Sequence, residues 1–160
     1  AVLNHWVEQY PDSLMAHENM AMTLTQQDKP EQAIKYLKRA LELCPNRESL
    51  RQQLLELKVE ESELPAKIQL SKAELESFVG HFKQNEDFKL DFFVRDNQLI
   101  SLSKRQGEMM LYPIGNNRFF VEEVQGIVTF KETRDGKHQR MVLTGFGKTY
   151  HYLRSEKTGK

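Results

Sequence analysis

The 160-residue sequence lacks the features of several common protein classes. Its single cysteine, Cys44, cannot form an internal disulfide, so cysteine usage does not identify a compartment. The 23 basic residues equal the 23 acidic ones, which argues against nucleic acid and anionic lipid as partners. No apolar run approaches the roughly 20 residues that span a bilayer. With 39% apolar and 29% charged residues, the composition is that of a globular rather than a disordered protein.

The chain also starts without an initiator methionine or a signal peptide. Its first residues already have the pattern of the middle of a helix. We therefore expect the sequence to be the C-terminal part of a longer protein, with some of the function encoded upstream of Ala1.

Residues 1–58 have helical periodicity and contain no glycine. Pro30 suits the first turn of a helix, Asp28 and Glu31 stand at capping-box spacing, and Pro45 stops the helix. Apolar residues recur at helical spacing in two stretches: Leu14, Met20, Ala21 and Leu24, then Ala33, Leu37, Ala40 and Leu41.

These helices resemble a tetratricopeptide repeat, a 34-residue pair of antiparallel helices. The residues that fit its pattern are Ala21, Ala33, Leu37, Ala40 and Pro45, and Pro11 precedes Pro45 by one repeat length. Residues 47–58 then resemble a terminal capping helix. The resemblance implies the end of a longer array whose concave face binds a peptide, or alternatively packs on the other half of the chain. The candidate residues of this groove are Met15, Glu18, Met22, Thr25 and Gln26.

The second half of the sequence has the pattern of a small β-domain. We expect a charged linker at 59–70, the domain itself at 71–154 and a tail at 155–160. A capping box at Ser71 and Glu74 opens a short helix, and everything after Gly80 has strand character. Apolar runs with turn residues between them predict eight strands, near 80–84, 88–96, 99–105, 108–114, 118–122, 126–132, 140–145 and 148–153. No helical pattern interrupts them, so an antiparallel sandwich or barrel is expected.

Three short motifs invite a catalytic or nucleotide-binding interpretation. The run Gly147–Thr149 ends like a phosphate-binding loop, but the first glycine is missing, since Val142 stands there, and a strand pattern follows. We therefore interpret it as a hairpin turn. Ser101 and Lys104 match S-x-x-K, and Lys157–Gly159 matches K-T-G, both typical of serine acylases. In a strand the first pair would point to opposite faces, so we expect no catalysis by these residues.

No metal or cofactor site can be recognised in the sequence. Five histidines occur without i,i+4 pairing and without a neighbouring cysteine: His5, His17, His81, His138 and His151. We expect His81 and His151 to be ordinary strand residues. The aromatic residues concentrate after residue 78. They either fill the barrel, which we favour, or line a cavity for a small apolar ligand whose residues the sequence does not identify.

Residues 70–154 together resemble the lipocalin-like β-barrel at the C-terminus of β-lactamase-related serine hydrolases. The signature of that family corresponds to Phe78–Phe82 here. Further matching positions, in order, are Leu99, Leu111–Pro113, Asn116, Phe119, Phe120, Val128, Phe130 and Asp135–Gly136. The resemblance implies an accessory domain rather than a catalyst, with the active site in a preceding domain and tetratricopeptide-like helices between the two.

The sequence thus predicts an α+β chain, with tetratricopeptide-like helical hairpins followed by an antiparallel, roughly eight-stranded lipocalin-like barrel. Its expected function is that of a non-catalytic accessory region of a larger secreted or periplasmic serine hydrolase. It would position or cap the active site or mediate assembly, with the upstream hydrolase domain as its partner in cis. The alternative is a stand-alone binding module, holding a small apolar ligand in the barrel or a peptide on the helices.

Overall fold

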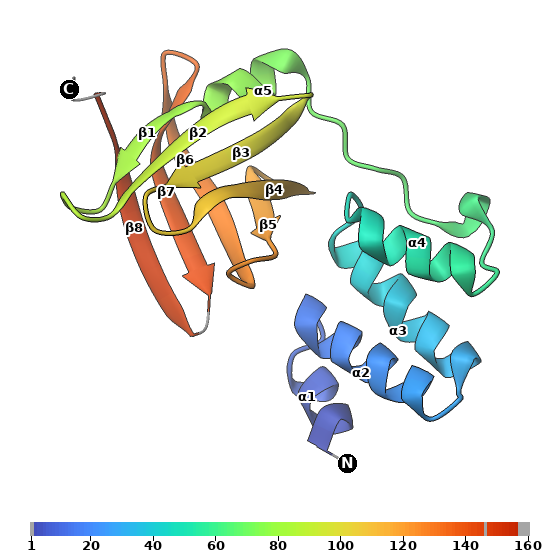
Figure 1. The fold of residues 1–160 in the computed structure, drawn as a ribbon. Helices are drawn as coiled ribbons and strands as arrows, with labels where there is room; N and C mark the ends of the chain where they lie inside the picture. Colours follow the sequence, from blue (N-terminus) through green and yellow to red (C-terminus); the bar gives the residue numbers. More distant parts are fainter. Residues whose placement is uncertain (1, 146, 157–160) are drawn as a thin grey trace. The chain divides into compact units, whose positions relative to one another are not determined.

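The structure, a computed structural model, describes residues 2–145 and 147–156, with side chains from Asn4 onward. The chain divides into two compact units, 1–68 and 69–160. In Figure 1 the first is the helical part in blue to green and the second is the barrel in green to red. The predicted α+β fold, helices followed by a closed antiparallel barrel of eight strands, is confirmed.

The first unit consists of short helices joined by tight connections. Their bounds are α1 Val2–Gln9, α2 Leu14–Gln26, α3 Pro30–Leu43, α4 Glu48–Glu56 and a 3₁₀ turn, η1, at Glu61–Glu63. The hydroxyl of Ser13 caps α2 by accepting a hydrogen bond from the Ala16 amide at 3.2 Å. Pro30 begins α3, as predicted, because its missing N–H would be unbonded in a first turn anyway.

The capping box predicted at Asp28 and Glu31 is wrong. Asp28 has a φ of +56°, and the residue that caps α3 is Lys29, which makes no side-chain cap hydrogen bond. Asp28 therefore lies in the turn after α2, where its left-handed backbone reverses the chain. The spacing alone did not distinguish this turn from a cap.

Small side chains let α2 and α3 pack closely. Ala16, Ala33 and Ala40 have no exposed surface, and Ala21 is 1% exposed. Larger apolar residues complete the core of this unit, namely Leu14, Met20, Leu24, Leu37, Leu41, Leu50 and Leu54. The alternation of small and large residues that defines the repeat thus coincides with the buried face.

The segment after α4, expected to be a linker, is fastened to the helices. Asn46 donates its amide to the carbonyl of Ile68 at 2.8 Å and accepts the Ile68 amide at 2.7 Å. The buried Arg51 donates to the carbonyl oxygens of Pro45 and Pro65 and to the Glu61 carboxylate. The chain up to Ile68 therefore belongs to the helical unit.

The second unit opens with α5 (Lys72–Phe78) and continues as a barrel. Its strands are β1 Gly80–Lys83, β2 Lys89–Arg95, β3 Gln98–Ser103, β4 Gly107–Gly115, β5 Arg118–Val121, β6 Gly126–Arg134, β7 Lys137–Gly145 and β8 Lys148–Ser155. Each strand pairs antiparallel with the next, and β8 pairs with β1 to close the barrel. The capping box of α5 is confirmed, since Ser71 and Glu74 bond each other's backbone amides.

Two-residue turns join strands at one end of the barrel, where both central residues have positive φ: Asp96 and Asn97, Asn116 and Asn117, and Asp135 and Gly136. These residue types tolerate the left-handed backbone that such hairpins require. Residues Gly147–Thr149 lead directly into strand β8, and no helix follows them among the described residues. The phosphate-loop interpretation is therefore excluded by the local structure.

α5 covers the end of the barrel where β1 begins (Figure 1). Phe78 stacks parallel to His138 at the start of β7, with ring centroids 4.8 Å apart, and meets Phe119 and Phe130 at 5.0 and 4.8 Å. Phe82 and Phe92 extend this aromatic cluster. Their ring centroids lie 5.5 Å apart, and those of Phe82 and Phe92 lie 5.6 and 5.1 Å, respectively, from the centroid of Phe130. Aromatic side chains therefore fill the half of the barrel next to α5, whereas the sequence favoured filling of the whole barrel; the opposite half retains a hollow.

Candidate functional site

The predicted peptide-groove residues lie along α2 but differ in exposure. Glu18 is bound by Arg47, which donates to its carboxylate at 2.6 Å, and Met15 is half-buried. Met22, Thr25 and Gln26 are exposed, with Met22 at 56%. Only the C-terminal half of this face thus presents free side-chain surface to a partner.

The serine and lysine of the S-x-x-K match are kept apart by the barrel. Ser101 lies in β3 between Phe92 and Met109, both core residues, and is 2% exposed. Its hydroxyl has no hydrogen-bond partner in the structure. Lys104 lies beyond the end of β3 and is exposed. The two groups cannot act as nucleophile and base together, while Lys157–Gly159 lies outside the described residues.

A histidine, a carboxylate and a hydroxyl do meet elsewhere, on the outer face of the barrel. His81 faces Asp91 across β2 and Ser155 across β8, in one cross-strand row. The Nδ1 atom of His81 lies 2.6 Å from an Asp91 carboxylate oxygen. No hydrogen bond joins His81 to Ser155, so the row contains a bonded pair and a neighbouring hydroxyl. Sequence analysis missed this row because its members come from three different strands.

The barrel is open at the end opposite α5. A hollow of about 1160 Å³ lies there, bounded by the β1–β2 and β3–β4 turns, by β8 and by the row of His81, Asp91 and Ser155. Its apolar and aromatic lining consists of Phe82, Phe88, Leu90, Leu102, Val124, Leu143, Tyr150 and Tyr152. Burial raises the pKa of the Tyr152 phenol, which is consistent with its place below the opening.

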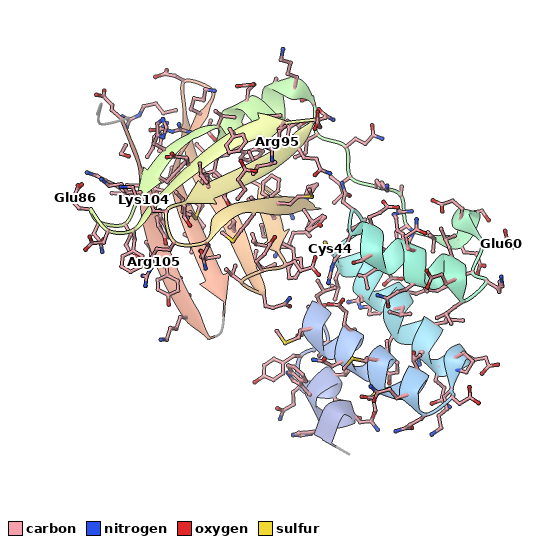
Figure 2. The ribbon with its side chains drawn as sticks, viewed as in Figure 1. Cys44, Glu60, Glu86, Arg95, Lys104 and Arg105 are labelled. Atoms are coloured by element: carbon pink, nitrogen blue, oxygen red, sulfur yellow. The ribbon has the colours of Figure 1, made fainter. Side chains whose placement is uncertain are left out.

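Charged side chains surround this opening. Glu86 binds both Lys89 at 2.7 Å and Lys83 at 3.0 Å, and these bonds lower its pKa to about 2. The Arg105 guanidinium lies over the Phe88 ring, 5.2 Å from its centroid. Figure 2 shows Glu86, Lys104 and Arg105 on the turns at this end of the barrel.

Three cations at the opening form no ion pair with any carboxylate of the described chain: Lys104, Arg105 and Lys148. Lys83 and Lys89, by contrast, share the single carboxylate of Glu86. The carboxylates of Asp87, Asp91 and Glu156 also line the hollow, which therefore combines an aromatic lining with charged groups of both signs. Neither the hollow nor its charge could be read from the sequence, because the contributing turns are far apart along the chain.

The described residues contain no group of three or more potential metal ligands. Among the helices that the structure describes, none has the length and apolar character needed to cross a membrane.

Comparison with known proteins identifies part of the helical unit. Residues 15–47 match the tetratricopeptide repeat family. This match covers α2 from its second residue, α3 and the turn before α4, and it includes the residues whose small-large pattern indicated the repeat. Searches of curated proteins and of solved structures gave no match. Repeats of this kind suggest interaction with another protein.

Proposed function

We propose that this chain is a non-catalytic accessory region that works beside a β-lactamase-related serine hydrolase domain, in the periplasm or outside the cell. The helices would bind that domain in cis, and the barrel would cap or position its active site. The tetratricopeptide match supports a protein-binding role for the helices. The hydrolase as partner follows from the resemblance of residues 70–154.

The observation that carries the non-catalytic part is the position of Ser101. A nucleophile must be reachable by substrate and must lie within hydrogen-bond distance of a base. Ser101 is sealed among core residues with its hydroxyl unbonded, and the lysine three residues on is outside the barrel. The chain therefore needs a catalytic domain from elsewhere if it serves a hydrolase.

The partner is tested by photo-crosslinking in living cells of the source organism. A benzoylphenylalanine at the exposed position Met22 is expected to capture peptides of a serine hydrolase domain, on the same polypeptide or on another one. The same group at Lys35, which is exposed on α3, serves as the control. Equal capture from both positions, or capture of a protein without such a domain, would contradict the proposal.

The absence of catalysis is tested with a fluorophosphonate, which labels activated serines. No labelling of the purified chain is expected. Labelling that disappears in Ser155→Ala would show instead that the row formed by Asp91, His81 and Ser155 is an active site.

A second candidate function is the binding of a small apolar ligand, favoured by the aromatic lining of the open end. The neutral dye N-phenyl-1-naphthylamine is expected to gain fluorescence with the full chain. Leu143→Trp, which fills the hollow, should abolish that gain. Leu153→Trp is the matched control, because Leu153 is 58% exposed on the outer face of β8. Equal fluorescence with both variants would place the dye elsewhere.

A further inference from the structure

The covalent connection between the two units is much shorter than the linker that the sequence predicts at 59–70. Val59 and Leu64 are buried, and the side chain of Arg51 donates to the carbonyl oxygen of Pro65. This part of the segment therefore packs as a continuation of the helical unit, well beyond the end of α4.

Asn46 fixes the end of this segment by its backbone. The side-chain amide of Asn46 donates to the carbonyl oxygen of Ile68 at 2.8 Å, and its side-chain oxygen accepts the Ile68 amide at 2.7 Å. Both polar groups of Ile68 are thus bonded, as they would be opposite a hydrogen-bonded residue of a neighbouring antiparallel strand. The pair of bonds holds the orientation of Ile68 as well as its position.

The barrel side of the connection is anchored as soon as it begins. Leu70 packs against the core of the barrel, and Ser71 opens the capping box of α5 with Glu74. The C-terminal end of α5 is held in turn, because Lys137 of β7 donates to the carbonyl oxygen of Glu76 at 2.5 Å. Leu70 therefore moves with the barrel.

Gln69 alone separates these two anchors. It is exposed, and it makes no hydrogen bond in the part of the chain that the structure describes. Two residues of extended chain span at most about 7 Å, which limits the separation of Ile68 and Leu70 in every orientation. A flexible linker over the whole of 59–70 would instead have a root-mean-square length of about 19 Å.

We propose that Gln69 is the single joint between the helical unit and the barrel, and that the side-chain amide of Asn46 keeps this joint short. A partner that orients the helices then restricts where the barrel can reach, and it has the barrel at a high effective concentration beside it. The use of this restriction to position the barrel at an active site rests on the proposed function, whereas the joint itself does not.

Hydrogen exchange tests the two anchors residue by residue. The Ile68 amide should exchange about tenfold or more slowly than the Gln69 amide in the full chain. Asn46→Ala should remove that difference, whereas Gln53→Ala, at an exposed position of α4, should preserve it. Equal exchange of the two amides in the unaltered chain would overturn the proposal, because Ile68 would then be free or Gln69 would be fixed as well.

Nitrogen-15 relaxation of the full chain tests whether the joint couples the motions of the two units, which otherwise move independently by default. Both units should share one rotational correlation time. A Gly-Ser linker of about six residues inserted after Gln69 should give each unit its own correlation time, about twofold shorter, since each has about half of the residues. The same insertion between Asn116 and Asn117, in a turn of the barrel, is the matched control and should preserve the shared value.

Two outcomes of the relaxation experiment contradict the proposal. If the units tumble separately in the unaltered chain, the joint does not couple them. If the insertion after Gln69 changes nothing, an interface rather than the short joint holds the units together. Neither outcome bears on the hydrolase partner, which the crosslinking at Met22 tests, so the two proposals can fail independently.

Discussion

Replacing Gly80 by alanine is expected to destabilise the barrel more than the same replacement at any other glycine that the structure describes. Gly80 has a φ of +151°, a backbone region that side chains rarely adopt. A Cβ built at this position would lie 1.9 Å from the Nη1 atom of Arg154. The methyl group therefore cannot fit unless the guanidinium moves.

The guanidinium of Arg154 is held on three sides. It donates to the carbonyl oxygens of His138 at 2.5 Å and Val79 at 2.9 Å. It also lies over the Phe82 ring, 4.8 Å from the centroid. Each hydrogen bond from a charged donor contributes about 1.5 kcal/mol, and the cation–π contact contributes about 1 kcal/mol. With backbone strain of about 1–3 kcal/mol, the expected loss is about 5 kcal/mol of unfolding free energy.

Thermal unfolding followed by circular dichroism at the strand band measures this loss. For a barrel of this size, a decrease of about 5 kcal/mol lowers the melting temperature by roughly 20 °C or more. The fluorescence of Trp6, the only tryptophan, reports the helical unit in the same sample. Gly107→Ala is the control, because Gly107 also has positive φ, +74°, but no atom within 4 Å of the added Cβ. We expect it to cost about 1 kcal/mol.

A double-mutant cycle isolates the collision from the backbone strain. Arg154→Met removes the guanidinium and keeps most of the apolar stem. In that background Gly80→Ala should cost only the backbone strain. The cost of the alanine should therefore be about 2 kcal/mol or more smaller than in the chain that keeps Arg154, and this difference is the coupling free energy. The reasoning is refuted if the alanine costs the same with and without the guanidinium, or if it costs no more than the control at Gly107.

Three further predictions concern single side chains. Burial lowers the pKa of His138 below its usual 6.5, and the Arg154 cation adds to this effect, so protonation favours the unfolded chain. Barrel stability should therefore rise as the pH increases through about 6.5, and His138→Phe should flatten that dependence in denaturant titrations at pH 5 and pH 7.5. Arg51→Ala leaves two loop carbonyls and a carboxylate without their buried donor and should cost the helical unit about 3 kcal/mol by urea unfolding, against less than about 1 kcal/mol for the exposed Arg39→Ala. Ser101→Ala removes a buried hydroxyl without a partner and should leave stability unchanged or raise it by about 1 kcal/mol; a loss of that size in calorimetry would mean that the hydroxyl is bonded.

The sequence predicted the barrel well because its signals are local. Apolar runs of strand length and left-handed turn residues such as Asn116 and Asp135 depend only on nearby positions, and all eight expected strands are present. The capping box at Ser71 succeeded for the same reason. The one at Asp28 failed because two signals, a proline at the first helical position and an acid before it, fit both a cap and a turn.

The open end could not be predicted, because it depends on how far one strand continues beside another. β1 has four residues and β8 has eight, and both lengths fit the alternation of their apolar residues. Only their register shows that the pairing of β8 with β1 stops at Leu153, while residues 148–152 of β8 pair with β7 alone among the described strands. The same register places the guanidinium of Arg154 over Gly80, 74 residues earlier in the chain. The glycine in the sequence signature therefore has a physical reason that its neighbours in the chain do not reveal: it makes room for an arginine from the last strand.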